Sequence, residues 1–252
     1  MLKNIPNTIT SLNLLSGCFS ILFACSGQFE IAFICIILAA VFDFFDGMAA
    51  RALKAYSPIG KELDSLADMV SFGVAPAIMM VMCAMMIVSS GIDEFTGSTI
   101  LQKGYSNLVI FMPLLIAVFS GIRLAKFNID TRQTENFIGL ATPACALLCG
   151  SLIYSSEVYP PIAIILVSYP FIFPILAIIL SYLLISEIPM FSFKFKNFTW
   201  QDNSIRFIFL GIVAMLGILT ILFRVNWSVW ILSIFICYIL LNVIKHLIPK
   251  KN

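Results

Sequence analysis

The sequence predicts an all-α integral membrane protein, a polytopic bundle of about eight transmembrane helices with both termini in the cytoplasm. Of the 252 residues, 61% are hydrophobic and only 11% are charged, and the mean hydropathy is +1.04. This composition excludes a soluble domain. Apolar runs of about twenty residues are long enough to cross a bilayer. They occur at 9–26, 29–50, 63–89, 106–127, 137–156, 160–186, 205–222 and 227–247.

The distribution of basic residues supports an even number of spans. With both termini in the cytoplasm, almost all of the 15 lysine and arginine residues face inward, and only Lys103 and Arg224 face outward. Such an excess of positive charge is typical of cytoplasmic loops. Residues 1–186 would form a core of six transmembrane helices, and residues 187–252 an interfacial linker and two more. In that linker aromatic residues alternate with lysines between Met190 and Trp200, which indicates contact with the membrane surface and not with nucleic acid.

One otherwise apolar segment, Phe42–Asp68, is rich in acidic residues. Ionisable side chains at membrane depth are costly unless they have a partner, so they mark a functional site. Two pairs are spaced i, i+3 and i, i+4, and each pair therefore lies on one face of a helix. Tyr56-Ser57-Pro58 breaks the helix between the pairs, and helices joined by such a turn can bring their carboxylates together. The acidic residues are Asp43, Asp46, Glu62, Asp64 and Asp68.

These side chains favour a pair of divalent cations. Four carboxylates in one small space cannot all stay ionised without counter-charge, and oxygen-only ligands suit Mg²⁺ or Mn²⁺ better than zinc. No histidine lies nearby, because His246 is the only one in the chain. Small residues let a phosphate ester approach the backbone closely, and basic residues stand beside them. These small and basic residues are Gly47, Ala50, Gly60, Arg51, Lys54 and Lys61.

The complete pattern is Asp43-x2-Asp46-Gly47-x2-Ala50-Arg51-x8-Gly60-x3-Asp64-x3-Asp68. It resembles the signature of the CDP-alcohol phosphotransferase family, membrane enzymes that displace CMP from a CDP-linked lipid with an alcohol. The resemblance implies that the four aspartates hold two metal ions and that Asp68 is also the general base. It further implies a CDP and phosphate site formed by Gly47, Ala50, Arg51, Ser57, Gly60, Asn7 and Thr10. Helix capping and interhelical hydrogen bonds are an alternative role for Asn7 and Thr10.

Three further stretches resemble the phosphatidylserine synthase branch of that family. They are SFGVAPA at 71–77, RLAKFN at 123–128 and GLATPA at 139–144, where Ala141 replaces a proline common in the branch. This resemblance implies CDP-diacylglycerol and L-serine as substrates, with serine bound by Arg123, Lys126 and Asn128. A cationic side chain suits the carboxylate of serine, although positive-inside anchoring would also place basic residues here. Relatives of this kind are commonly homodimers, and all contact membrane lipids.

Two alternatives stay open. Within the family, the acceptor could be glycerol phosphate or inositol phosphate. From another class, the chain could be an ion-coupled transporter that uses the aspartates as its cation site, although transporters usually show two related halves with sites at the membrane midplane. The active site is expected on the cytoplasmic side of a bacterial inner membrane. Separately, Pro76, Pro170 and Pro174 predict helix kinks.

Overall fold

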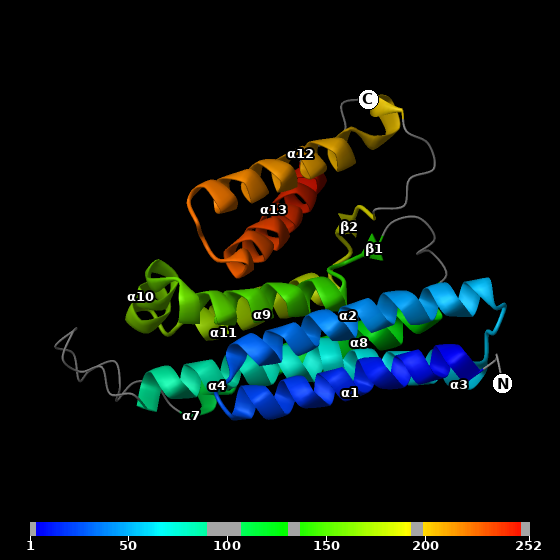
Figure 1. The fold of residues 1–252 in the computed structure, drawn as a ribbon, viewed down its shortest axis with the longest axis horizontal. Helices are drawn as coiled ribbons and strands as arrows, with labels where there is room; N and C mark the ends of the chain where they lie inside the picture. Colours follow the sequence, from blue (N-terminus) through cyan, green and yellow to red (C-terminus); the bar gives the residue numbers. More distant parts are fainter. Residues whose placement is uncertain (1–3, 90–106, 131–136, 193–198, 248–252) are drawn as a thin grey trace.

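The computed structural model describes residues 4–89, 107–130, 137–192 and 199–247, and within these ranges the chain is almost entirely helical (Figure 1). Besides the helices, these described ranges contain one pair of two-residue strands. The elements are α1 (Ile5–Cys25), α2 (Phe29–Ala52), α3 (Pro58–Asp68), η2 (Met69–Val74), α4 (Ala75–Ser89), α7 (Asn107–Ile110), α8 (Leu114–Ile129), β1 (Phe137–Ile138), α9 (Thr142–Val158), α10 (Pro160–Ser168), α11 (Ile172–Ile185), β2 (Pro189–Met190), α12 (Trp200–Leu222) and α13 (Trp227–Leu247).

Small side chains allow α1 and α2 to form a closely packed hairpin. The turn between them contains Gly27, whose φ of 73° favours glycine. On α1 the buried face includes Gly17, Ser20 and Ala24, and the Ser20 hydroxyl donates to the carbonyl of Ala32 on α2 at 2.9 Å. Because the side chains on this face of α1 are small, the helix also packs closely against α3, η2 and α4.

The third span runs from α3 through η2 to α4 as one helical rod from Pro58 to Val88. Ser57 caps its start, with the hydroxyl accepting from the Gly60 amide at 3.0 Å, and Pro58 occupies the first turn. Residues Met69–Val74 are π-helical, and the amide of Ala75 donates to the carbonyl of Val70. Pro76 has no amide hydrogen for an α-helical bond. A kink was predicted at Pro76, and the structure has a π turn immediately before this proline.

The next part of the core differs from the spans expected at 106–127 and 160–186. In the first, a turn with i to i+3 bonds around Pro113 separates α7 from α8. In the second, the helix breaks before Pro170, so that α10 and α11 are separate elements. A kink was expected at Pro170, and the structure shows a complete break there, because proline cannot continue the backbone ladder. The helices α9 and α10 meet at 105°.

The last two helices lie on one side of the bundle, over α9 (Figure 1). α13 packs against α9, and α12 contacts α13. The strand β2 pairs antiparallel with β1, with Met190 opposite Phe137. This pairing ties the segment that follows α11 to the segment that precedes α9.

The structure and its hydropathy establish a polytopic membrane helix bundle, and the chain is an integral membrane protein. Within the described residues, five helices are long and apolar enough to cross a membrane, or six if the bent pair α9–α10 forms one span. They are Ile5–Cys25, Phe29–Ala52, Pro58–Val88, Asn203–Leu222 and Trp227–Leu247. The predicted count of eight is not reached by these criteria, because α8 and α11 are short. Lys194 and Lys196 of the predicted interfacial linker lie outside the described residues.

Candidate active site

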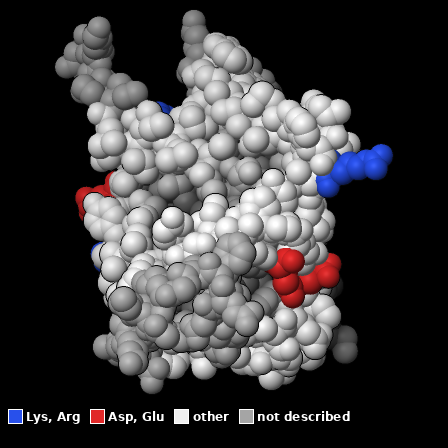
Figure 2. Space-filling model, turned by 90° about the vertical axis from the view of Figure 1, so that its left-hand side faces the viewer, with Lys and Arg blue, Asp and Glu red and all other residues white. Residues whose placement is uncertain are grey.

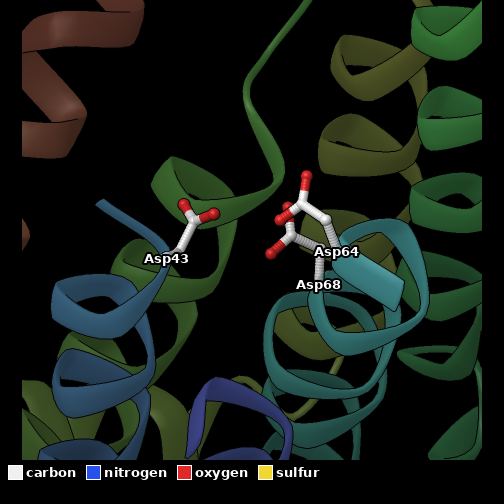
Figure 3. A group of neighbouring side chains, drawn as sticks. All are labelled: Asp43, Asp64 and Asp68. Carbon is white, nitrogen blue, oxygen red and sulfur yellow. The ribbon is translucent and has the colours of Figure 1, made fainter. Parts of the chain in front are cut away.

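Three of the four predicted aspartates meet at one end of the bundle. One carboxylate oxygen from each of Asp43, Asp64 and Asp68 lies within 4.8 Å of the other two. Figure 3 shows Asp64 and Asp68 on α3 directed toward the side where α2 carries Asp43. Asp68 is buried, whereas Asp43 and Asp64 are partly exposed. The cluster is therefore closed toward the bundle and open toward the end of the helices.

Asp46, the fourth predicted aspartate, is not a member of this group of three. It lies one turn after Asp43 on α2 and is 6% exposed. Its Oδ2 accepts a hydrogen bond from the Thr10 hydroxyl at 2.6 Å. The Thr10 hydroxyl oxygen also lies 3.0 Å from the carbonyl oxygen of Pro6, so its single proton has two acceptors within reach. Asp46 is thus held against α1, beside the cluster.

The polar face of α1 contacts the acidic residues at two successive turns, through Thr10 and Asn13. Asn13 is fully buried, and its Nδ2 donates to Asp68 Oδ1 at 3.1 Å. At the other end of this face, a Cβ added to Gly60 would lie 2.8 Å from Asn7 Oδ1. Asn7 and Thr10 were predicted to belong to a CDP and phosphate site. Asn13 shares their i, i+3, i+6 helical face, but it was not assigned to the site.

Close backbone packing of α1 against η2 fixes the position of α1 relative to the third span. A Cβ added to Gly17 would lie 2.7 Å from the Cα of Ser71 in η2. The Ser71 hydroxyl donates to the carbonyl of Asn13 at 3.0 Å. The π turn therefore presents Ser71 to the same helix that contacts Asp68, and the two contacts hold α1 and the third span together at the height of the cluster.

The donor set fits a hard divalent cation. It consists of oxygen atoms, which suit Mg²⁺, Mn²⁺ or Ca²⁺. Among the described residues, the buried atoms Asp64 Oδ1 and Asn13 Oδ1 have no hydrogen-bond partner, and buried polar atoms ordinarily have one. The neighbouring cationic groups are engaged elsewhere. Lys61 Nζ donates to the carbonyl of Asn128 at 2.9 Å, and Arg51 Nε donates to the carbonyl of Gly47 at 2.9 Å.

The small residues predicted for phosphate binding have different surroundings. A Cβ added to Gly47 would meet nothing within 4 Å, so packing within the chain does not require glycine there. Gly60 lies against Asn7 and Ser57, and the Ser57 hydroxyl caps α3. Ala50 is partly exposed, and Arg51 is exposed. These residues lie on α2 and α3, around the turn that separates the two pairs of aspartates.

A second group of predicted residues lies at the end of α8. Arg123 is 7% exposed, and its guanidinium carbon lies 5.8 Å from the centre of the Phe127 ring. Its Nη1 is 3.5 Å from the Thr142 hydroxyl, at the limit of hydrogen bonding, and its Nε has no partner among the described residues. Its charge interacts with that of Asp68. Arg123 therefore stands between the acidic cluster and α9.

Arg123 and Lys126 line a cavity of about 370 Å³. Acidic side chains also line it, so the cavity carries both signs of charge. Its other lining residues are Ile129, Asp130, Ile138, Leu184, Ile185, Ser186 and Glu187. Asn128, the third residue predicted for serine, is not in this lining. Its Nδ2 donates to the Ser65 hydroxyl at 2.8 Å, which joins the end of α8 to α3.

Comparison with known proteins assigns the chain to a family. Residues 3–183 match the sequence profile of the CDP-alcohol phosphatidyltransferases. The chain belongs to this family. The acidic cluster and the Arg123 cavity lie largely inside the matched range, whereas α12 and α13 lie beyond it. The family membership predicted from the aspartate pattern is confirmed.

Several curated relatives of the chain have serine in their names. It is 34% identical over 147 residues to a CDP-diacylglycerol–serine O-phosphatidyltransferase of Helicobacter pylori, a match that covers 57% of this chain and 54% of the relative. It is 33% identical over 190 residues to the Bacillus subtilis protein of the same name, covering 75% and 91%. An archaetidylserine synthase of Methanothermobacter thermautotrophicus is 34% identical over 149 residues, covering 58% and 56%. The chain thus spans about half the length of several curated relatives that it matches.

Proposed function

We propose that the chain transfers the phosphatidyl group of CDP-diacylglycerol to L-serine, which yields phosphatidylserine and CMP. The observation that carries the proposal is the meeting of Asp43, Asp64 and Asp68 within 4.8 Å in a member of this family. The names of the relatives support serine as the acceptor. Membrane lipids would surround the helices, and by family analogy the enzyme would be a homodimer.

The proposed metal site consists of Asp43, Asp46, Asp64 and Asp68, holding two Mg²⁺ or Mn²⁺ ions. The chemistry that such a pair supplies is neutralisation of the diphosphate and stabilisation of the departing CMP. Asp46 would join the other three through its second oxygen, because Thr10 engages Oδ2. The absence of nitrogen and sulfur ligands supports hard cations over zinc.

Asp68 is the proposed general base. The serine hydroxyl oxygen would attack the phosphorus atom that bears the diacylglycerol, and the bond from this phosphorus to the CMP oxygen would break. The hydroxyl proton would pass to Asp68, whose Oδ1 is held by Asn13, so Oδ2 is the oxygen that remains for the proton. Base catalysis requires that oxygen to lie about 3 Å from the hydroxyl in the substrate complex.

The proposed substrate sites flank this base on two sides. The CDP and phosphate groups would lie along α2, α3 and the start of α1. The residues assigned to them are Gly47, Ala50, Arg51, Ser57, Gly60, Asn7 and Thr10. Serine would enter from the cavity lined by Arg123 and Lys126, with Asn128 at the end of α8. Because that cavity carries both basic and acidic side chains, it suits an acceptor with a carboxylate and an ammonium group better than a doubly charged phosphate.

We further propose that the aspartate end faces the cytoplasm of a bacterial inner membrane. The chain would cross eight times with both termini inside, residues 1–186 forming the catalytic core and residues 187–252 the linker and last two spans. Figure 2 views the opposite end, where few blue side chains are visible. The basic residues of α2, α3 and α8 lie at the aspartate end, whereas Arg224 follows α12 in the turn to α13. This asymmetry supports the proposed orientation, and reporter fusions at both termini would test it.

The activity is tested by measuring CMP release from CDP-diacylglycerol in parallel with serine, glycerol phosphate and inositol phosphate. We expect release with serine and Mg²⁺ or Mn²⁺ only. Release with one of the phosphorylated acceptors would refute serine but keep the family chemistry. Absence of release with all three would instead favour the ion-coupled transporter.

A further inference from the structure

The segment Ser186–Ser192, which follows α11, borders the Arg123 cavity and is called the wall below. Its first two residues, Ser186 and Glu187, line the cavity together with Arg123 and Lys126. The Ser186 hydroxyl donates to the carbonyl of Leu183 at 2.9 Å, which fixes the end of α11. The segment contains no α-helix, so its position depends on the elements that hold it.

The core holds the segment from one side. Its strand β2 pairs with β1, and the amide of Gly139 donates to the carbonyl of Ile188 at 2.9 Å. Gly139 has a φ of +75°, and an added Cβ would lie 2.8 Å from the carbonyl oxygens of both Leu184 and Ser186. Glycine is therefore required where the backbone before α9 crosses the end of α11.

The last helix holds the segment from the other side. The amide of Phe191 donates to Asn242 Oδ1 at 2.9 Å, and the carbonyl of Phe191 accepts from the Tyr238 hydroxyl at 3.0 Å. Asn242 Nδ2 donates in turn to the Tyr238 carbonyl at 2.8 Å. Asn242 is 1% exposed, and Phe191 and Tyr238 are similarly buried. α13 thus satisfies both backbone groups of one residue in this wall.

Aromatic packing and a second helix complete the attachment. The Phe191 ring lies edge-on to Tyr238, with centroids 5.0 Å apart, and to Phe209 of α12 at 5.5 Å. Arg206 of α12 donates from Nε to the carbonyl of Ser192 at 2.7 Å. Buried hydrogen bonds to backbone groups are costly to break, because the group left behind stays unsatisfied.

We propose that Tyr238 and Asn242 are positioning residues for the acceptor: they hold the wall Ser186–Ser192 against Arg123, so that α13, which lies outside the family match, sets the affinity for serine. The inference rests on the proposed function. It gives the last two helices a role in substrate binding beyond that of a membrane anchor. Neither residue needs to touch the acceptor, since both act through the backbone of Phe191.

The test uses the full-length protein with Tyr238→Phe and Asn242→Ala. Tyr238→Phe removes one donor and keeps the ring packing, so it preserves the fold even if Asn242→Ala does not. We expect each variant to raise the KM for serine by about five- to tenfold, the effect of one or two buried hydrogen bonds. The kcat and the KM for CDP-diacylglycerol should stay within about twofold of the wild type, and hydrogen exchange at residues 186–192 should accelerate.

Ser228→Ala is the matched control on the same helix. It removes the acceptor of a buried hydrogen bond of 2.9 Å that the Ser155 hydroxyl of α9 donates to Ser228. The wall is not touched, and the serine KM should not change. An unchanged serine KM in both test variants, or equal changes for the two substrates, would overturn the inference. A wild-type protein that releases no CMP with serine refutes the proposed function instead, and the inference falls with it.

Discussion

Replacing Asn13 by alanine should slow the reaction strongly with little loss of stability. Asn13 is fully buried, and among the described residues its side chain makes one hydrogen bond, from Nδ2 to Asp68 Oδ1 at 3.1 Å. Hydrogen bonds to charged groups contribute about 1.5–3 kcal/mol. If this energy orients Asp68 in the transition state, its loss lowers kcat by about 10- to 150-fold. The KM for serine should change little, because Asn13 lies on α1, away from the Arg123 cavity.

The assay is CMP release at saturating CDP-diacylglycerol and serine, with thermal unfolding of the purified protein in detergent measured alongside. Ser20→Ala is the control, since Ser20 is also fully buried on α1 and its hydroxyl bonds to the carbonyl of Ala32, not to the acidic cluster. Both variants should unfold at slightly lower temperatures. A kcat within threefold of the wild type for Asn13→Ala would refute the reasoning, as would an equal loss for Ser20→Ala.

The remaining predictions concern the cluster, its packing and the cavity. Asp64→Asn should abolish turnover while the protein still inserts into the membrane, because the cluster loses one of its three converging carboxylates; full activity in the purified variant would contradict this. A chelator should remove activity, and added Mg²⁺ or Mn²⁺ should restore it and raise the unfolding temperature of the wild type but not of Asp64→Asn. Gly17→Ala should cost about 1–3 kcal/mol of stability through overpacking, because the new Cβ would lie 2.7 Å from the Cα of Ser71; an unchanged unfolding temperature would show that α1 can move away freely. Arg123→Lys should raise the KM for serine by about tenfold or more, because lysine lacks the planar fork of donors. The KM for CDP-diacylglycerol should stay at the wild-type value. The opposite pattern would assign Arg123 to the nucleotide site.

The acidic site was largely predictable because helical periodicity and one turn were enough to describe it. The spacing of Asp43, Asp64 and Asp68 and the break at Pro58 predicted carboxylates from two helices that converge. The different environment of Asp46 was not predictable, since it depends on a hydrogen bond to Thr10, 36 positions earlier in the chain. Long-range contacts of this kind leave no periodic signal in the sequence.

The helices beyond the first three were harder to predict from the sequence. Hydropathy marks apolar residues but not backbone direction, so 160–186 was expected to be one span with kinks at Pro170 and Pro174. The chain instead breaks before Pro170, and α10 turns by 105° from α9. Arg123 was predicted to bind serine, which stays a prediction, and the cavity that it lines was not predicted. The wall that borders this cavity is built from β1, β2 and contacts to α13, all of them distant in sequence.

The π turn at Met69–Val74 makes the third span tolerant of losing one residue at this place. A π turn accommodates one residue more than the α-helical ladder needs. Deleting a single residue between Met69 and Val74 would let the rod close into a regular α-helix, and the segments before and after it would keep their relative orientation. The loss would be local, at Ser71, whose backbone packs on Gly17 and whose hydroxyl bonds to the carbonyl of Asn13. A deletion in the regular α-helical parts of the span would instead turn one half by about 100° relative to the other.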